Sequence, residues 1–216
     1  MPLSSRCLSS SPSIPLPFLL WIPLLVVFGC GKKNPVEMVS ADQSGVEIRE
    51  VASVGDSDWN AWRGPRFDGV AADQPVATEW DEKTNVLWKT DIPGRGHGSP
   101  IVVGDAVFVA TADENKSTQS VIRLDRADGS GRWETVIHKG GFPSPGEIHK
   151  KATNANGTIA CDGQRLYIGM FNSDSIIATA LSLDGEILWQ QPIGKFVSKF
   201  GYAPSPILYK SFVILA

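Results

Sequence analysis

Short apolar runs separated by turns dominate the chain from residue 86 onward. The turns are rich in Gly, Asp and Pro, and no helical period of useful length appears beyond residue 80. This pattern predicts an all-β protein. The predicted strands are Val86–Thr90, Ser99–Val103, Ala106–Ala112, Gln119–Asp125, Gly131–Ile137, Gly157–Cys161, Arg165–Met170, Ile176–Leu183, Glu186–Gln191, Ser205–Tyr209 and Phe212–Leu215.

Two of the predicted hairpins repeat one pattern. Val121–Trp133 and Ala180–Trp189 each run from an apolar strand through an Asp-Gly turn to a Trp. Glycine takes the positive φ that such a tight turn requires. Trp88, Trp133 and Trp189 each close a group of strands, at spacings of 45 and 56 residues. Four antiparallel strands per unit at this period predict a β-propeller, because a β-sandwich of similar strand density would not repeat the pattern.

The units resemble the pyrroloquinoline-quinone-like (PQQ-like) propeller repeat, whose mark is Leu-Asp, a Thr/Asp-Gly turn and then Trp. Leu124-Asp125, Asp128-Gly129 and Trp133 match this mark, and Leu183-Asp184-Gly185 with Trp189 matches it with a shorter turn. In that family the Trp docks between neighbouring blades, so the resemblance implies structural, blade-docking roles. The residues concerned are Trp88, Asp125, Gly129, Trp133, Asp184, Gly185 and Trp189.

The resemblance covers residues 58–216. Trp62–Gly69, His149–Asn156 and Phe200–Pro206 resemble segments of the exported propeller proteins of planctomycete-like bacteria. More loosely, the chain is similar to the eight-bladed outer-membrane assembly lipoproteins. About two and a half blades are present, with Val86–Thr90 as the early strand that would seal the ring. Since a propeller needs at least about four blades to close, we expect an N-terminal fragment with one blade face and one strand edge open.

Residues 1–29 are predicted to be a lipoprotein signal peptide. The apolar run Ile14–Phe28 is short for a membrane helix and contains three prolines. Leu25–Cys30 resembles a bacterial lipobox, which implies that Cys30 receives a lipid and anchors the protein without spanning the membrane. An ordinary secretory signal and an uncleaved anchor are the alternatives. Residues 30–57 are polar without a sustained period, so we predict a flexible tether before the partial propeller at 58–216.

Charge and cysteine content narrow the possible partners. The net charge is −3 with no basic block, so no electrostatic footprint for nucleic acid is present. Membrane contact would therefore come from the lipid rather than from charge. Cys7, Cys30 and Cys161 lack zinc-site spacing. Cys161 is expected to be a small buried hydrophobe in a strand.

The long connection Gly140–Thr158 is the candidate binding site. Loops longer than about 12 residues in a compact domain are often functional. Propeller ligands usually bind where such loops meet the central channel. An imidazole, two cations and an amide here could receive an anion or a carbonyl. The alternative is that they form hydrogen bonds that anchor the loop. The candidates are His149, Lys150, Lys151 and Asn154, with Lys199 and Tyr202 at the matching place one blade later.

Two other segments have both a functional and a structural interpretation. Asp58–Gly69 holds Trp59 and Trp62, which with Arg63 could form a platform for a sugar or cofactor. We favour a clasp that packs its indoles onto the domain. Gly94–Gly98 resembles a phosphate loop only superficially, because a strand rather than a helix follows it. We expect a flexible crossover there, with His97 as a lone imidazole.

These observations predict an exported, membrane-anchored lipoprotein facing the periplasm or the cell exterior. We expect a non-enzymatic binding or scaffold module for an envelope protein, with no cofactor. One alternative is a fragment of a quinoprotein dehydrogenase that uses PQQ and calcium. Such enzymes carry a calcium site of Glu, Asn and Asp, an adjacent-cysteine disulfide and an aspartate base. The sequence has no vicinal Cys pair, and we identify no calcium triad. The other alternative is a carbohydrate-binding propeller using Trp59 and Trp62.

Overall fold

The computed structural model describes residues 54–71, 75–144 and 146–216, all within the second of two compact units, Val36–Ala216. The predicted signal peptide, Cys30 and the tether up to residue 53 lie outside the described residues. The described residues contain strands and no helix. The strands are β1 (Ile101–Val103), β2 (Ala106–Asp113), β3 (Thr118–Asp125), β4 (Gly131–Lys139), β5 (Ala160–Cys161), β6 (Arg165–Asn172), β7 (Ser175–Ser182), β8 (Ile187–Lys195), β9 (Ile207–Tyr209) and β10 (Phe212–Ile214).

The strands form two four-stranded antiparallel sheets and one hairpin. Blade 1 has the order β1-β2-β3-β4, blade 2 has the order β5-β6-β7-β8, and β9 pairs with β10. The first two strands of each unit pair at the same position, through Ile101 and Phe108, Ala160 and Tyr167, or Ile207 and Ile214. The predicted all-β fold of four-stranded propeller blades is confirmed. Every predicted strand except the first is present, with ends shifted by a few residues.

The two blades repeat each other even in their irregularities. β3 and β4 slip in register between Gln119 and Ser120 and again between Arg123 and Leu124. β7 and β8 slip at the corresponding places, Ile176/Ile177 and Ala180/Leu181. Such bulges add a residue to one strand and increase its twist. The repeated bulges identify the two sheets as copies of one structural unit.

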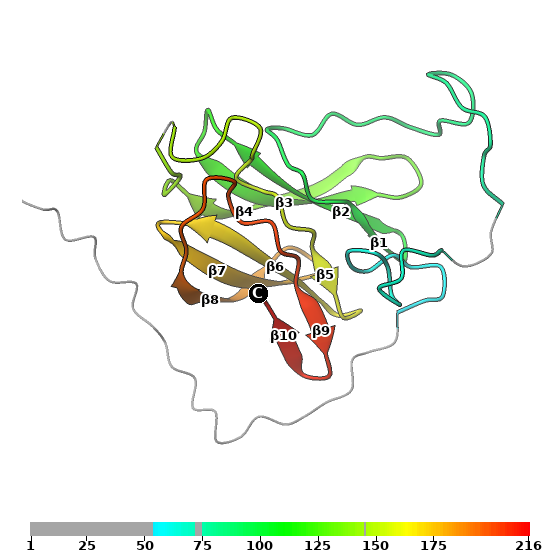
Figure 1. The fold of residues 1–216 in the computed structure, drawn as a ribbon. Helices are drawn as coiled ribbons and strands as arrows, with labels where there is room; N and C mark the ends of the chain where they lie inside the picture. The colour runs from blue at the N-terminus through cyan, green and yellow to red at the C-terminus, as the bar shows by residue number, and fades with distance from the viewer. Residues whose placement is uncertain (1–53, 72–74, 145) are drawn as a thin grey trace, which may run out of the picture. The chain divides into compact units, whose positions relative to one another are not determined.

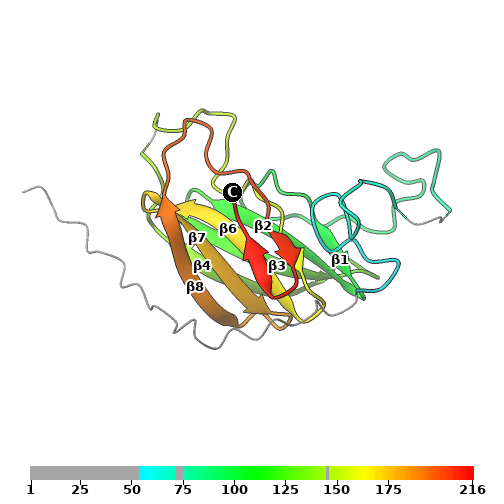
Figure 2. The same ribbon diagram turned by 60° about the horizontal axis from the view of Figure 1, so that its bottom comes forward.

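An apolar core lies between the two blades, which pack face to face (Figures 1 and 2). Phe108 and Val121 of blade 1 belong to the same buried cluster as Leu166 and Met170 of blade 2. None of these four side chains is more than 2% exposed. Because the core is shared, neither sheet buries its apolar face alone.

The prediction of a strand at Val86–Thr90 is wrong. Among the described residues, no backbone hydrogen bond joins this segment to a sheet. Side chains hold it instead, because the Trp88 indole N–H donates to the carbonyl of Arg126 at 2.9 Å and Thr90 Oγ1 donates to that of Gly129 at 2.6 Å. Trp88 and Ile92 then cover a second apolar cluster on the other face of blade 1. Of the apolar residues in this segment, only Trp88 packs on blade 1, since Val86 is 44% and Leu87 is 90% exposed.

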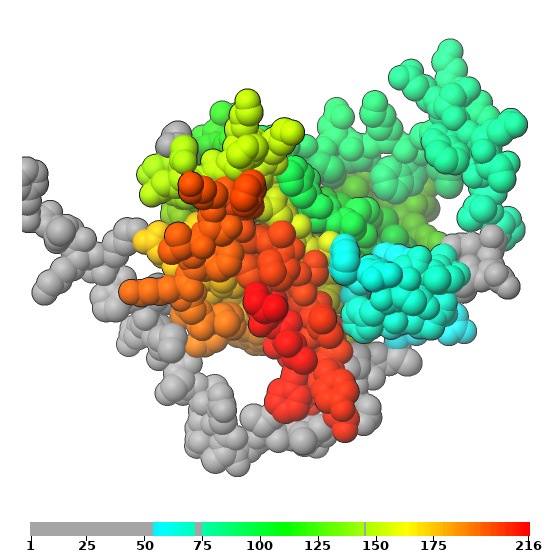
Figure 3. All heavy atoms as spheres, in the orientation of Figure 1, coloured from blue at the N-terminus to red at the C-terminus, as the bar shows by residue number. Residues whose placement is uncertain are grey.

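The clasp, residues Asp58–Gly69, joins the first strands of both blades. The N–H of Trp59 donates to the carbonyl of Val102 in β1 at 2.8 Å, and the Val102 N–H donates back at 3.0 Å. The N–H of Cys161 in β5 donates to the Asn60 carbonyl at 2.8 Å, and Asn60 Nδ2 donates to the Cys161 carbonyl at 2.7 Å. Figure 3 shows the clasp, in cyan, as a compact lobe.

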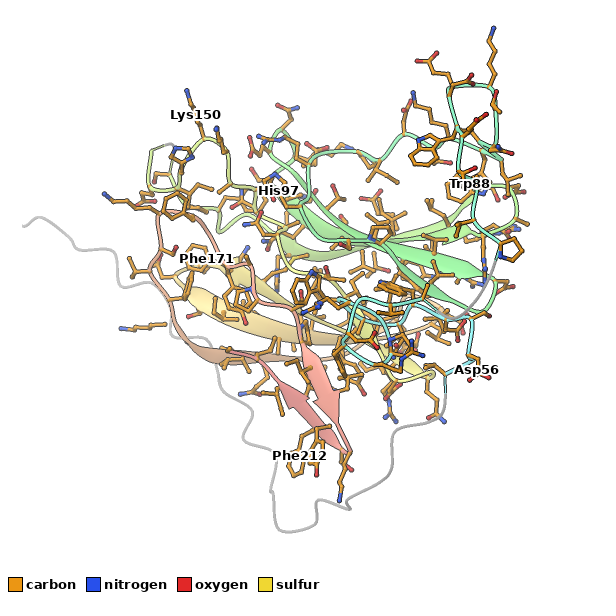
Figure 4. The ribbon with its side chains drawn as sticks, turned by 45° about the vertical axis from the view of Figure 1, so that its right-hand side comes forward. Asp56, Trp88, His97, Lys150, Phe171 and Phe212 are labelled. Carbon is orange, nitrogen blue, oxygen red and sulfur yellow. The ribbon has the colours of Figure 1, made fainter. Side chains whose placement is uncertain are left out.

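The turns define two ends of the blades. Because neighbouring strands are antiparallel, the β1–β2 and β3–β4 turns lie at one end. The β2–β3 turn and the connection from β4 to β5 lie at the other. The clasp contacts the first end, where Asp58 Oδ1 accepts a hydrogen bond from the Gly104 N–H at 2.8 Å. Figure 4 shows Lys150 and His97 on one side of the sheets and Asp56 on the other. We call the end that the clasp contacts the clasp end. The opposite end, near Lys150 and His97, is the loop end.

Candidate functional site

A hollow of about 730 Å³ lies at the loop end, and we call it the groove. One wall is the long loop, residues 140–158, and the others come from the β2–β3 turn and the Gly94–Gly98 segment. It brings three of the sequence candidates together, His149, Lys150 and Asn154. Its charged and aromatic lining side chains are Arg95, Glu114, Phe142, His149 and Lys150. Its volume is within the range typical of ligand sites.

Two buried amide side chains hold the long loop near both of its ends. Gln119 of β3 is 0% exposed and donates from Nε2 to the carbonyls of Asn154 at 2.6 Å and Phe171 at 3.1 Å. Asn172 of β6 donates to the carbonyl of Gly140 at 2.8 Å and to Gln119 Oε1 at 3.2 Å. A buried amide left without partners costs about 1–3 kcal/mol. The blades therefore fix where the loop leaves and re-enters the fold.

His138 completes this network as a neutral imidazole. Its Nδ1 lies 2.8 Å from Gln119 Oε1, and its Nε2 lies 3.2 Å from Gln190 Nε2. A carbonyl oxygen only accepts and an amide nitrogen only donates, so the proton lies on Nδ1 and Nε2 accepts. Burial lowers the pKa of His138 to about 4. Protonation would place a second N–H against the Gln190 donor, so the network favours the neutral ring.

Arg95 extends from a backbone that is fixed on both sides. Its N–H donates to the Ala112 carbonyl at 2.8 Å, and the Ala112 N–H donates back at 2.9 Å. A Cβ on Gly94 or Gly96 would come closer than 3.0 Å to the β2 backbone, so only glycine permits this approach. We expected a flexible crossover, but Gly94–Gly98 is packed along β2. Sequence reasoning missed Arg95 because it carries no motif.

His149 is held so that one ring nitrogen remains available. Its N–H donates to the Lys199 carbonyl, and its ring lies 5.5 Å from the Phe200 ring. The Lys151 N–H donates to Nδ1 at 3.2 Å. Nδ1 is therefore the acceptor, and the neutral ring carries its proton on Nε2. An exposed Nε2–H can donate to a ligand.

The structure does not bring the side chains of Lys199 and Tyr202 to the groove. Lys199 contributes its carbonyl to His149 and is itself exposed. Tyr202 is 4% exposed and packs edge-on against Phe196 with ring centroids 5.4 Å apart. Burial raises the pKa of the Tyr202 phenol, whose oxygen has no hydrogen-bond partner among the described residues. Both residues support the neighbourhood of the long loop rather than line the groove.

The repeated Trp lies at the junction between the blades, at the clasp end. Trp133 Nε1 donates to the carbonyl of Leu183 at 3.1 Å, and Thr135 Oγ1 donates to that of Gly185 at 2.7 Å. The Trp88 and Thr90 bonds to blade 1 have the same form. The sequence signal for this junction is therefore Trp-x-Thr, a pattern that places both side chains on the same side of an extended segment. Only the Trp of this pattern is predicted from the sequence. Trp189 has Gln191 rather than Thr two positions later, and it is 40% exposed.

The two repeated aspartates lie at the turns. Asp125 stabilises its own turn by accepting from the Ala127 N–H at 2.8 Å and pairing with Arg132 at 2.6 Å. The Arg132 hydrogen bond is the main cause that lowers the pKa of Asp125. Asp184 is exposed, and its backbone N–H donates to Ser182 Oγ. Neither carboxylate reaches the adjacent blade, so the junction relies on the Trp, the Thr and the turn carbonyls.

A second repeated contact joins the units before their first strands. The Ser99 N–H donates to Thr158 Oγ1 at 2.9 Å, and the Thr158 N–H donates to Ser205 Oγ at 3.0 Å. These three residues occupy equivalent positions, two before the strand pairs described above. The sequence places these three residues at the starts of the units but does not reveal the hydrogen bonds between them. The repeated signal was a hydroxyl residue after Gly or Pro.

The two clasp tryptophans differ in their surroundings. Trp59 packs on Gly64, where a Cβ would lie 2.9 Å from its ring, and lines a hollow of about 390 Å³ with Arg66. Trp62 is 52% exposed and has the Arg63 guanidinium 5.7 Å from its ring centroid. Only the first indole packs onto the domain. The two rings do not line one common hollow.

Potential metal ligands among the described residues are His, Cys, Asp and Glu side chains. No group of three or more His, Cys, Asp or Glu there is arranged to hold a metal ion. Cys161 is buried and unpaired, and burial raises its thiol pKa to about 11. Within the same ranges, no helix has the length and apolar character to cross a membrane.

The family model described as outer membrane protein assembly factor BamB matches residues 68–199. The chain belongs to this PQQ-like family. The comparison with curated proteins found no match. The PQQ-like match spans both blades, both Trp-x-Thr junctions and the whole groove. Trp59, Tyr202 and the β9–β10 hairpin lie beyond its bounds.

Proposed function

We propose that this PQQ-like propeller protein is an exported, lipid-anchored binding module that acts without catalysis and holds a protein partner of the cell envelope in the groove. One observation carries the proposal. The groove is formed by a long loop that Gln119 and Asn172 hold near both ends, so its polar side chains present a fixed surface. A preorganised surface binds with less loss of conformational entropy.

The anchor rests on the Leu25–Cys30 lipobox and is tested separately. Wild-type chain produced in a bacterium should incorporate labelled palmitate and fractionate with membranes. Cys30→Ser should lose the label and leave the membrane fraction. Unlabelled wild type, or a Cys30→Ser variant that stays in the membrane fraction, would remove the lipid from the proposal.

Binding at the groove is tested by site-specific crosslinking in living cells. A photo-reactive residue replaces Lys150 at the groove, and in the control replaces Asp184, which is also exposed but lies at the clasp end. We expect a discrete adduct with one envelope protein from position 150 and none from position 184. The same adduct from both positions, or no adduct from position 150, would contradict the proposal.

A further inference from the structure

We propose that the groove recognises a single carboxylate on an extended peptide segment flanked by apolar residues, through Arg95, His149 and Lys150. This inference rests on the proposed function and adds the chemistry of the partner. It follows from the charges that line the groove, the donors that remain available there and the apolar surface beside them.

The cations of the groove are available to a ligand. Within the described ranges, neither Arg95 nor Lys150 forms an ion pair, whereas Arg66, Arg123 and Arg132 each pair with an aspartate. A guanidinium presents its N–H groups in a fork that matches a carboxylate. The fixed backbone of Arg95 reduces the entropy lost when that fork is engaged.

The donors of the groove come from two separate segments of the chain. Arg95 extends from the segment packed on β2, and His149 and Lys150 come from the long loop. His149 offers its Nε2–H because its Nδ1 already accepts from the Lys151 backbone. A carboxylate has two oxygens and about four acceptor positions, enough to accept from donors of both segments.

Glu114 limits which anions fit. It lies on the β2–β3 turn and is the acidic side chain that lines the groove. Arg95 and Lys150 carry two positive charges and Glu114 carries one negative charge. The groove is therefore positive by one charge, in a chain whose net charge is −3. One carboxylate is thus favoured, while a second negative charge would face Glu114. Polyanions such as nucleic acid or oligophosphates are disfavoured for the same reason.

The apolar part of the groove determines what should flank the carboxylate. Phe142 packs against the core cluster between the blades and also lines the groove, beside Pro143 and Ile148. A half-buried aromatic next to charged groups favours a ligand with an apolar side chain beside its acid. A peptide segment provides both at fixed spacing.

The test compares two blocked pentapeptides by calorimetry on the full chain. The probes are acetyl-Ala-Phe-Glu-Leu-Ala-amide and the same peptide with Gln in place of Glu. We expect the acidic peptide to bind about tenfold more tightly, with the difference shrinking as salt increases. Arg95→Gln should reduce this ratio to about one. Arg66→Gln removes the same charge from the clasp and should leave the ratio unchanged.

The outcomes separate this inference from the proposed function. Equal binding of the two peptides, or an unchanged ratio in Arg95→Gln with wild-type unfolding, overturns the carboxylate site. If position 150 still crosslinks an envelope protein in that case, the proposed function stands. Inorganic phosphate that displaces the acidic peptide at equal concentration would also overturn the preference for a single carboxylate. Peptide discrimination without any crosslink from position 150 would instead contradict the proposed function.

Discussion

The junction between the blades makes a quantitative prediction at Gly185. This glycine has a φ of +88°, and a Cβ built on it would lie 2.8 Å from Thr135 Oγ1 and 2.8 Å from the Trp133 ring. Gly185→Ala therefore adds a left-handed backbone penalty and a collision with the docking side chains. Gly140 separates the two costs, since its φ is +75° and a Cβ there meets no atom within 4 Å.

The magnitudes follow from the two terms. A left-handed conformation costs an L-residue about 1–2 kcal/mol, which is the whole expected cost of Gly140→Ala. Overpacking a well-packed contact costs a further 1–3 kcal/mol, roughly. Gly185→Ala should therefore destabilise the fold by about 2–5 kcal/mol. The difference between the two variants measures how tightly Trp133 and Thr135 hold the turn of the adjacent blade.

Urea unfolding of the full chain, followed by fluorescence and circular dichroism, provides the measurement. A double variant adds a stringent control, because Trp133→Ala removes most of the obstacle. Gly185→Ala should then cost about 1–3 kcal/mol less in the Trp133→Ala background than alone. Equal costs for Gly185→Ala and Gly140→Ala, or strict additivity in the double variant, would refute the docking geometry.

Three further outcomes can be measured on the same chain. Trp133→Ala alone should lower the free energy of unfolding by about 3–5 kcal/mol and leave peptide affinity at the groove unchanged. Loss of that affinity would contradict a purely structural role. Gln119→Ala leaves the Asn154 and Phe171 carbonyls without this donor, so it should cost about 3 kcal/mol and speed hydrogen exchange in the long loop, which unchanged exchange would contradict. The folded pKa of His138, about 4, lies below the unfolded value of roughly 6.5, so its stabilising effect is complete above pH 6.5 and is lost as pH falls towards 4. Wild type should lose about 2 kcal/mol more than His138→Gln between pH 7 and 5, and parallel pH profiles would argue against a neutral His138 ring.

Local signals in the sequence were sufficient for the blades. Asp128-Gly129 and Gly104-Asp105 are turn pairs, and the positive φ of their glycines is a local property. The apolar runs beside these turns are short enough to indicate buried strands. The strand at Val86–Thr90 was a reasonable inference from the same signals. It is wrong because apolar composition does not require pairing: Trp88 packs half-buried on blade 1 without any strand partner, and Leu87 is 90% exposed.

The candidate site was harder to predict, because its geometry depends on contacts distant in sequence. The length of the long loop and the types of His149, Lys150 and Asn154 marked the region. Nothing local to Arg95 or Gln119 indicates that they meet this loop. Gln119 reads as one polar position in a strand, and its role comes from carbonyls 35 and 52 positions away. Sequence patterns report which residues are chemically suitable, and the topology decides which of them meet.

The clasp has a consequence for the order of events during synthesis. Asn60 and Cys161 are 101 positions apart, and ribosomes add about 5–20 residues per second. The second half of the clasp therefore lacks its partner for roughly 5–20 s after Asn60 is made, until after the strands of blade 1 are complete. An early segment thus waits for a partner made much later, and its closure marks the moment when the first strand of the second blade has arrived.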